Sequence, residues 1–334
     1  MGTLNLLAAD IGGTKVALAL FEWTPGGPWR VMAEARYVSA DHPTFTEILK
    51  DFRLHHPQPV QATGLGIAGP VFERRCQATN LPWVVDAREL EASLPLGRVA
   101  LINDFKAAAL GVLHMKEPDW VELNPGVPEP RAPIAVLGAG TGLGEALLFH
   151  DGHRYQVVST EGGHKDFAPR NEEEMGLLRF MLKRHARVSY ERLLSGAGIR
   201  AIYDHLIEAG AGPARVDLQR RFEAEDDAAL IAGHAAAGDD PVCIQAMEMF
   251  TRIYGAEAGN LALQVLARGG VYIAGGIGPK NLARMQDGQF QTAYRHKGRF
   301  SDLVASIPVR MVINPYVALV GAAAAAAELE AQSG

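Results

Sequence analysis

The stretch LAADIGGTKVALAL, residues 7–20, sets one acid and two glycines between two apolar runs. Apolar, β-rich runs on either side of a Gly-Gly pair are typical of a β-hairpin, so we predict strands over 4–10 and 16–23. Asp10 stands at the end of the first strand. A buried sheet has no use for a lone carboxylate, so either the turn is only a turn or Asp10 binds a ligand.

A second hairpin of the same kind occupies residues 133–152, PIAVLGAGTGLGEALLFHDG. When the two hairpins are aligned, Gly13 falls on Gly140 and Thr14 falls on Thr141. The chain has 334 residues, about twice the length of a typical single domain. Two similar strand–turn–strand units, each opening one half of the chain, therefore predict an internally duplicated two-domain fold.

The remaining segments alternate between strand and helix signals. A long helix is expected to begin after Asp240, with Pro241 in its first turn, and to end before Gly269. The mixture of patterns predicts an α/β protein with mixed sheets flanked by helices. The other predicted elements are a helix near 43–54, strands over 62–71 and 98–104, a mostly helical region over 171–268, a strand, turn and helix start over 271–282, and a helix over 318–332 that returns to the first domain.

Composition excludes several classes of protein. The net charge is −6, and no long Lys/Arg run offers a footprint for nucleic acid or an anionic membrane. Cys76 and Cys243 are the only cysteines, which provides neither a disulfide framework nor a cysteine zinc site. The sequence shows no signal peptide and no apolar run long enough to span a bilayer. We therefore expect a cytoplasmic protein that binds no nucleic acid and no membrane.

The glycine-rich segments do not match the common nucleotide motifs. GLGIAG, residues 64–69, formally fits the dinucleotide fingerprint, but Pro70 and a charged, aperiodic stretch follow where a helix must open. We interpret it as a buried strand of small residues. The GAGTGLG turn has the wrong spacing, and no P-loop occurs. Any phosphate site is therefore neither Rossmann nor P-loop.

The two hairpin turns can still bind phosphate. Successive glycines let several N–H groups face one anion, and the Thr14 and Thr141 hydroxyls add donors. Asp10 beside the first turn would hold Mg2+ directly or through water, since Mg2+ prefers oxygen ligands. The alternative for either hairpin alone is an ordinary tight turn. Because the two turns occur together, with an acid on only one, we favour phosphate binding.

Asn103 and Asp104 end an apolar strand and precede an Ala-rich helix. Taken alone, Asp104 is better explained as the helix N-cap. Asn103 beside it gives two polar side chains at one strand end, where open α/β sheets place their ligands. Both interpretations stay open on the residues alone.

Glu161 and His164 flank a Gly-Gly bend in STEGGHKDFAP, and Glu191 lies early in SYERLLSGAG. The Glu-x-x-His spacing could form half of a metal site, but the glycines argue against a helix and no third ligand is near. A sugar is dense in hydroxyls and suits a set of Asn, Asp, Glu and His side chains. We therefore favour sugar binding over metal binding.

The chain resembles the bacterial glucokinases of proteobacterial type, in the hexokinase, actin and heat-shock ATPase superfamily. Each supporting segment is short, but their order and spacing make the resemblance specific, and together they cover nearly the whole chain. The segments are ADIGGTKVALAL, GIAGPV, TNLPWVVD, LINDFKAAALGV, VLGAGTGLG, STEGGHKDFAP, YERLLSGAG and YIAGGIGPK.

The resemblance implies two ribonuclease-H-like domains of actin/hexokinase type with a central cleft. The small domain would comprise 1–114 and 314–334, and the large domain 115–313. Asp104 would be the catalytic base and would bind sugar hydroxyls together with four other ligands, Asn103, Glu161, His164 and Glu191. The nucleotide and phosphate ligands would be Asp10, Gly12, Gly13 and Thr14 in the first turn, Gly138, Gly140, Thr141 and Gly142 in the second, and Gly275 and Gly276 in an adenosine-side turn.

The implied activity is ATP-dependent phosphorylation of D-glucose at the 6-hydroxyl, which feeds glycolysis. ATP and Mg2+ are the implied cofactors, with Asp10 on the Mg2+, and a homodimer is the implied assembly. Related repressor-and-kinase sugar kinases carry a cysteine-rich zinc motif after the Glu-Gly-Gly-His segment. Here that region reads KDFAPRNEEE, so no structural zinc is expected. The breadth of hexose specificity, and ADP or polyphosphate as the donor, stay open.

Two rival interpretations differ in class. A sugar-responsive transcription regulator needs a DNA-binding module, and the first predicted strand begins at residue 4 with no room before it for a helix-turn-helix. An actin-like filament protein would share the phosphate hairpins but would not need the Asn-Asp and Glu-Gly-Gly-His sets. Both are less consistent with the sequence than a sugar kinase.

Overall fold

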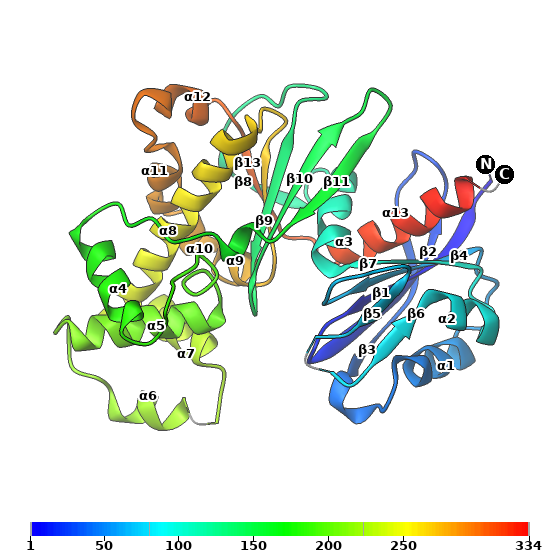
Figure 1. Cartoon of the computed structure of the whole chain (residues 1–334), viewed down its shortest axis with the longest axis horizontal. Helices are drawn as coiled ribbons and strands as arrows, with labels where there is room; N and C mark the ends of the chain where they lie inside the picture. The colour runs from blue at the N-terminus through cyan, green and yellow to red at the C-terminus, as the bar shows by residue number, and fades with distance from the viewer. Residues whose placement is uncertain (1, 80, 223, 333–334) are drawn as a thin grey trace. The chain divides into compact units, whose positions relative to one another are not determined.

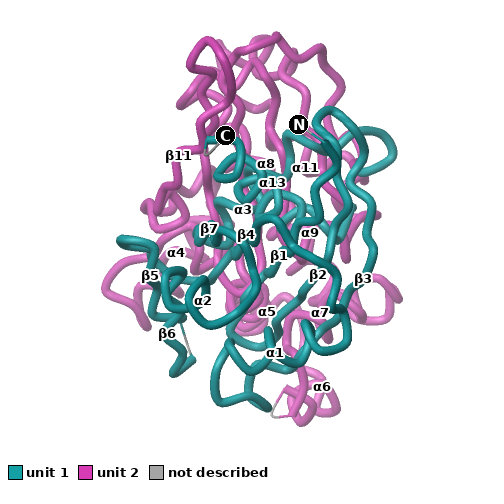
Figure 2. The backbone as a smooth tube through the Cα atoms, turned by 90° about the vertical axis from the view of Figure 1, so that its right-hand side faces the viewer, with its two compact units in different colours: residues 1–119, 314–334 teal, residues 120–313 magenta. Residues whose placement is uncertain are grey.

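The computed structural model describes residues 2–79, 81–222 and 224–332. The chain divides into two compact units, which are coloured separately in Figure 2. Unit 1 comprises residues 1–119 and 314–334, and unit 2 comprises residues 120–313. Each unit is built on its own central β-sheet. In the described part of the chain we find no helix with both the length and the apolar composition that crossing a bilayer requires.

Unit 1 contains a five-stranded sheet in the order β3-β2-β1-β4-β7 and a two-stranded sheet, β5-β6. β2 pairs antiparallel with both β3 and β1, whereas β1, β4 and β7 are parallel to one another. The strands are β1 (Leu4–Ile11), β2 (Lys15–Trp23), β3 (Arg30–Val38), β4 (Ala62–Ile67), β5 (Arg75–Gln77), β6 (Val84–Asp86) and β7 (Arg98–Asn103). The helices are α1 (Phe45–His55), α2 (Ala87–Ser93), α3 (Asp104–Gly111) and α13 (Val317–Ala331), with short 3-10 turns η1 (Ser39–Asp41) and η2 (Val112–His114).

The central strand β1 is buried on both faces, which explains its nearly continuous apolar sequence. Leu7, Ala9 and Ile11 belong to one core cluster, with the apolar side of α1 and with α2. Leu6 and Ala8 belong to another cluster, with α13. Figure 1 shows α1 and α2 on one face of the sheet and α13 on the other.

Helix α13 packs closely on the sheet and on α3 because small residues line the contact. An added Cβ at Gly64 of β4 would collide with the backbone carbonyl of Ala322. An added Cβ at Gly321 would collide in the same way with the carbonyl of Ala107 in α3. The alanine-rich sequence of α13 thus serves close packing as well as helix propensity.

The six-stranded sheet of unit 2 has the order β11-β10-β9-β12-β13-β8. Its first five strands repeat the topology of unit 1: β9 and β10 form the hairpin, β11 pairs antiparallel with β10, and β12 and β13 extend the sheet in parallel. β8 adds an antiparallel edge. The predicted internal duplication is therefore confirmed in the strand order. The strands are β8 (Trp120–Asn124), β9 (Ile134–Ala139), β10 (Leu143–His150), β11 (Tyr155–Thr160), β12 (Val271–Ala274) and β13 (Val309–Val312).

One hydrophobic core joins the unit 2 helices to this sheet. The longest described helix, α8, is buried along most of its length and begins as predicted, with Asp240 as N-cap and Pro241 in the first turn. It ends at Val265, with Leu266 in a left-handed conformation, so the helix stops earlier than the predicted Gly269. The helices are α4 (Glu172–Leu182), α5 (Gly196–Glu208), α6 (Val216–Arg221), α7 (Asp227–Ala237), α8 (Pro241–Val265), α9 (Ile277–Lys280), α10 (Leu282–Met285), α11 (Gln289–Arg295) and α12 (Ser301–Ala305), with 3-10 turns η3 (Gly162–His164) and η4 (Gly298–Phe300).

Most predicted elements are present. Both hairpins are confirmed, and GLGIAG lies in the fully buried strand β4 and its exit, not at the start of a helix. The edge strands β3 and β11 are not predicted by the sequence pattern. Both expose alternate side chains, so neither forms the continuous apolar run that marks a buried strand.

Candidate active site

Three polar side chains gather at one edge of the unit 1 sheet. β1, β4 and β7 are parallel neighbours, so their carboxyl ends meet at that edge. Asp10 lies near the end of β1, Asn103 ends β7, and Asp104 begins α3. Between them on β4 stands Gly66, where an added Cβ would lie 3.0 Å from the Cβ of Ala107. Glycine there lets α3 start close against the sheet.

The N-cap of α3 is Asn103. Its Oδ1 accepts hydrogen bonds from the N–H groups of Phe105 (3.0 Å) and Lys106 (3.1 Å). The interpretation of Asp104 as the cap is therefore wrong, because Asp104 already has helical backbone and the residue before it performs that role. Asn103 Nδ2 donates to Asp104 Oδ1 (2.9 Å) and to the Gly69 carbonyl (3.3 Å). The cap thus also fixes the Asp104 carboxylate.

The electrostatics of this edge disfavour two free carboxylates. Burial, and then the nearby charge of Asp104, raise the pKa of Asp10 to about 6. Burial also raises the pKa of Asp104, although hydrogen bonds from the Phe105 N–H and the Asn103 amide oppose that rise. A divalent cation near this edge would relieve the repulsion, and Mg2+ in proteins takes one or two carboxylates together with substrate phosphates. Asp10, with Asp104 close by, fits such an ion.

The first hairpin turn is supported from η1. The Gly12 N–H donates to the Lys15 carbonyl at 3.0 Å, which closes the turn. Ser39, which is fully buried, donates its hydroxyl to the Gly12 carbonyl (3.0 Å) and its N–H to the Thr14 carbonyl (2.9 Å). Both carbonyls therefore point inward. This arrangement leaves the N–H side of Gly13 and Thr14 as the side that can meet an anion.

The second turn spans Gly140 to Gly142 in unit 2. The Gly140 N–H donates to the Gly142 carbonyl (2.8 Å), and the Gly140 carbonyl accepts from the Gly196 N–H (3.0 Å) at the start of α5. An added Cβ at Gly140 would meet nothing within 4 Å, and Thr141 is exposed, so the turn faces open space. Gly138, assigned to this turn from the sequence, is instead a buried residue of β9.

The predicted adenosine-side turn lies next to the end of β9. Gly275 has a φ of +84°, and an added Cβ would lie 2.7 Å from the Ala139 carbonyl oxygen. Glycine is therefore required there by both conformation and space. Gly276 follows and opens the short helix α9. The structure thus brings Gly275 beside the strand that leads into the second turn.

The three predicted sugar ligands of unit 2 are neighbours. His164 Nδ1 lies 3.6 Å from Glu191 Oε1, and His164 Nε2 lies 3.9 Å from Glu161 Oε2. The Glu191 N–H donates to the Gly163 carbonyl (2.9 Å). Glu191 Oε2 in turn accepts a hydrogen bond from the N–H of Leu143 (3.0 Å), and Leu143 directly follows the second turn. Glu191 therefore connects the sugar set to the phosphate turn.

One pocket of unit 2, of about 590 Å3, contains members of both groups. Thr141 of the second turn lines it together with His164 and Glu191. Arg184 and Arg192 also line the pocket, which adds positive charge beside these residues. A pocket that holds hydroxyl ligands and cations next to a glycine turn suits a polyhydroxylated substrate with an anionic partner.

Comparison with known proteins gives a match along almost the whole chain. The family model described as Glucokinase matches residues 7–329. The chain belongs to the glucokinase family. A glucokinase from Nostoc sp. (strain PCC 7120) is 41% identical over 97% of this chain and 99% of its own length. A glucokinase from Yersinia pestis is 33% identical over 96% of both chains.

Solved glucokinases share the fold. The crystal structure of a glucokinase from an Antarctic psychrotroph is similar with a TM-score of 0.85 and 29% identity, covering 97% of this chain and 99% of that one. The mixed sheets flanked by helices in this chain agree with the α/β fold of hexokinase type expected from the sequence. The family match spans both residue sets, from Asp10 in unit 1 to Gly276 in unit 2.

Several supporting residues of this glucokinase-family chain are not predicted by the sequence. Ser39 supports the first turn from 27 residues further along the chain, and no local motif marks it. The Leu143 N–H, as a partner of Glu191, is equally invisible because backbone groups carry no sequence signal. Lys165 follows His164 directly, and that adjacency is the only sequence signal for its position behind the sugar set.

Proposed function

We propose that this chain transfers the γ-phosphoryl group of ATP to the 6-hydroxyl of D-glucose, which gives glucose 6-phosphate and ADP. The family match over residues 7–329 carries the proposal. The gathering of Glu161, His164 and Glu191 in unit 2 and of Asp10, Asn103 and Asp104 in unit 1 supports it. We assign unit 1 as the small domain and unit 2 as the large domain of the kinase.

Asp104 is the proposed catalytic base. Its Oδ1 is held by Asn103 Nδ2 and by the Phe105 N–H (2.8 Å), and Oδ2 is the oxygen proposed to accept the sugar proton. The raised pKa makes this carboxylate a stronger base than an exposed aspartate. It remains far weaker than an alkoxide, so the proton moves late, after the bond from the sugar oxygen to phosphorus has begun to form.

Asn103 can bind a sugar hydroxyl only by giving up a present partner. Its Oδ1 already accepts two hydrogen bonds, and both Nδ2 protons are engaged. The longest of these four bonds, 3.3 Å, goes to the Gly69 carbonyl. We propose that a sugar hydroxyl replaces Gly69 on Asn103 Nδ2 while the cap and the hold on Asp104 persist.

The glycine turns are the proposed site of the ATP phosphates. N–H groups of Gly13 and Thr14 would face one part of the triphosphate, and the turn from Gly140 to Gly142 another. Asp10 would hold Mg2+, whose positive charge offsets the charge on the transferring phosphoryl group. Gly275 and Gly276 would adjoin the adenosine.

The hydroxyl ligands of unit 2 set the position of the sugar. Glu161 and Glu191 accept hydrogen bonds from hydroxyls, and His164 either donates or accepts according to its tautomer. Because Glu191 also accepts a hydrogen bond from the Leu143 N–H, it joins the proposed sugar site to the residue after the second turn. We further propose a cytoplasmic homodimer, on the resemblance to bacterial glucokinases alone.

The decisive experiment is a coupled assay of purified protein with glucose, fructose, mannose and glucosamine, each with ATP, ADP or polyphosphate. Glucose 6-phosphate formation with ATP and Mg2+ is expected. The absence of product from glucose with every donor overturns the proposed function. ATP hydrolysis that is independent of sugar and accompanied by sedimentable polymer would favour a filament protein instead.

A further inference from the structure

A buried ammonium–carboxylate group lies directly behind the sugar ligands. Lys165 Nζ is 3.0 Å from Glu145 Oε2 on β10 and 2.6 Å from Glu257 Oε1 on α8. Both glutamates are buried, and their side chains are 1% exposed. One cation therefore bridges two carboxylates that come from different elements of unit 2.

The bridge is electrostatically necessary to both carboxylates. Burial raises the pKa of Glu145 to about 7, the Lys165 charge works against that rise, and the Glu257 charge adds to it. The two glutamates raise the pKa of Lys165 in turn, against the effect of its burial. Removing the ammonium from such a buried group leaves two carboxylates without compensation, which is strongly destabilising. The ammonium therefore holds β10 and α8 at a fixed distance from the segment that carries Lys165.

Lys165 belongs to the same short segment as two proposed sugar ligands. It follows His164 directly, and its N–H donates to the Gly162 carbonyl at 2.9 Å. Its carbonyl accepts from the Tyr190 N–H (3.0 Å), the residue before Glu191. Any shift of the Lys165 backbone therefore moves His164 directly and Glu191 through Tyr190.

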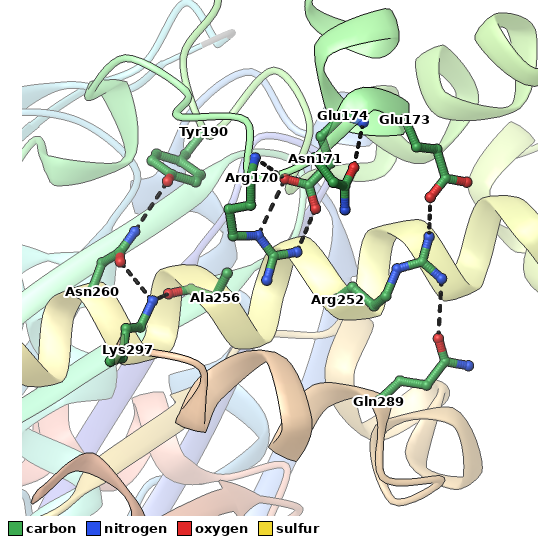
Figure 3. A network of polar contacts seen from close by, with 10 residues as sticks. All are labelled: Arg170, Asn171, Glu173, Glu174, Tyr190, Arg252, Ala256, Asn260, Gln289 and Lys297. Carbon is green, nitrogen blue, oxygen red and sulfur yellow. Dashed lines mark hydrogen bonds and ion pairs between the residues drawn. The ribbon is translucent and has the colours of Figure 1, made fainter. Parts of the chain in front are cut away.

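The segment that carries Tyr190 and Glu191 is also anchored on α8, close to Glu257. Asn260 Nδ2 donates to the Tyr190 hydroxyl (3.1 Å) and to Glu257 Oε2 (3.0 Å). Lys297 Nζ donates to Asn260 Oδ1 (2.7 Å) and to the Ala256 carbonyl (2.8 Å). Figure 3 shows Tyr190, Asn260, Lys297 and Ala256 in this chain of contacts along α8. Glu257 thus takes part in holding both sugar-ligand segments.

The segment that contains Gly162, Gly163 and Lys165 packs directly against Glu145. An added Cβ at Gly162 would collide with the Glu145 carboxylate, and one at Gly163 would collide with the Leu143 carbonyl. The Gly-Gly pair therefore lets the backbone lie directly on β10. The Gly-Gly pair and the Lys165 ammonium together pack the segment closely against β10.

We propose that Lys165 is a positioning residue for the sugar. Its ammonium, set between Glu145 and Glu257, fixes His164 and Glu191 in the geometry that receives glucose. The proposal rests on the proposed function, in which those two residues bind sugar hydroxyls. Lys165 itself acts through its neighbours and has no assigned contact with the substrate.

Lys165→Met tests the proposal, because methionine keeps most of the length and removes the charge. We expect the glucose KM to rise by about 10- to 100-fold, since a misplacement of about 1 Å can cost on the order of 100-fold, with the ATP KM unchanged and kcat within about threefold. Lys183→Met is the matched control: Lys183 also pairs with a glutamate at 2.6 Å, but that pair is exposed. The control should keep the wild-type glucose KM.

The double variant Lys165→Met/Glu145→Gln separates positioning from simple stability. In Lys165→Met, Glu145 and Glu257 are both left without a cation, and the double variant removes the charge of Glu145. It should therefore be more thermally stable than Lys165→Met, while the glucose KM stays raised. Lys165→Arg restores a cation and should recover part of the affinity. If the double variant or Lys165→Met has the wild-type glucose KM, Lys165 does not position the sugar ligands.

Hydrogen–deuterium exchange of the protein without substrate keeps the proposal testable if the chain phosphorylates no sugar. Lys165→Met should speed exchange at the amides of Lys165, Tyr190 and Glu191 by about tenfold or more, and Lys183→Met should not. Unchanged exchange at these amides overturns the proposal even if glucose turnover is normal. Absence of turnover in the wild type, with faster exchange in Lys165→Met, overturns the proposed function and leaves the fixing of these segments by Lys165 supported.

Discussion

Replacing Glu145 by glutamine should change how the stability of unit 2 depends on pH. Burial, together with the Glu257 charge, raises the pKa of Glu145 from an ordinary 4.5 to about 7 in the folded protein. Raised folded pKa means that folding favours the protonated acid. The contribution of Glu145 protonation to the free energy of unfolding is therefore fully present below about pH 4.5, and it is lost as the pH rises through about 7. Glutamine imitates the protonated acid and does not titrate.

The size of the effect follows from the two pKa values. One pKa unit corresponds to about 1.4 kcal/mol, so the shift from 4.5 to about 7 corresponds to about 3 kcal/mol. Glu145→Gln should therefore be nearly as stable as the wild type at pH 5 and more stable by up to about 3 kcal/mol at pH 8.5. The Lys165 ammonium stays paired with Glu257 in both proteins.

Urea unfolding at pH 5.0, 6.5, 7.5 and 8.5, followed by circular dichroism, measures the difference. Glu208→Gln is the control, because Glu208 is exposed, its pKa is lowered by Lys183, and it does not titrate in this range. If the difference in unfolding free energy between wild type and Glu145→Gln is the same at pH 5.0 and 8.5, Glu145 does not titrate there. The electrostatic account of the Lys165 group would then be wrong.

Three further predictions concern the site itself. Asp104→Ala should lower kcat by about 10²- to 10⁴-fold, the usual size of general-base catalysis, with a smaller change in the glucose Kd measured by calorimetry; near-normal turnover would contradict its role as the base. His164→Ala should mainly raise the glucose KM in the coupled assay, and a loss confined to kcat would point to His164 as the base instead. Gly275→Ala combines a φ of +84° with a Cβ 2.7 Å from the Ala139 carbonyl, so it should raise the ATP KM and lower the thermal midpoint, with the glucose KM unchanged; a wild-type ATP KM would separate this turn from the nucleotide site.

The parts of the fold that the sequence predicts are those where burial dominates. Central strands such as β1 and β9 are apolar on both faces, and the turns between them and their partners carry glycines. Edge strands have a less distinct sequence pattern, because only one of their faces is buried. In β3, Ala33, Ala35 and Tyr37 face the core while the residues between them are exposed, so a search for continuous apolar runs passes over this strand.

The residues of the candidate site also differ in how well the sequence predicts them. Residues that bear chemistry themselves, such as Asp10, Asp104 and His164, are visible in the sequence through their type and their neighbours. The choice between Asn103 and Asp104 as the cap depends on one residue of helix phase, which residue type alone does not determine. Partners that meet only after folding, such as Lys165 with Glu257 at 92 positions apart, carry no local pattern. These long-range partners are what the structure adds.

The place of α13 in unit 1 has a consequence for synthesis of the chain. Residues 317–331 cover the face of the sheet formed by Leu6 and Ala8, but the ribosome adds them after all of unit 2. During translation that face of the nascent sheet stays uncovered while 194 residues, 120–313, are made. Exposed apolar surface in a half-made protein invites aggregation. Unit 1, although it begins the chain, can therefore cover this face of its sheet only after all of unit 2 has been synthesised.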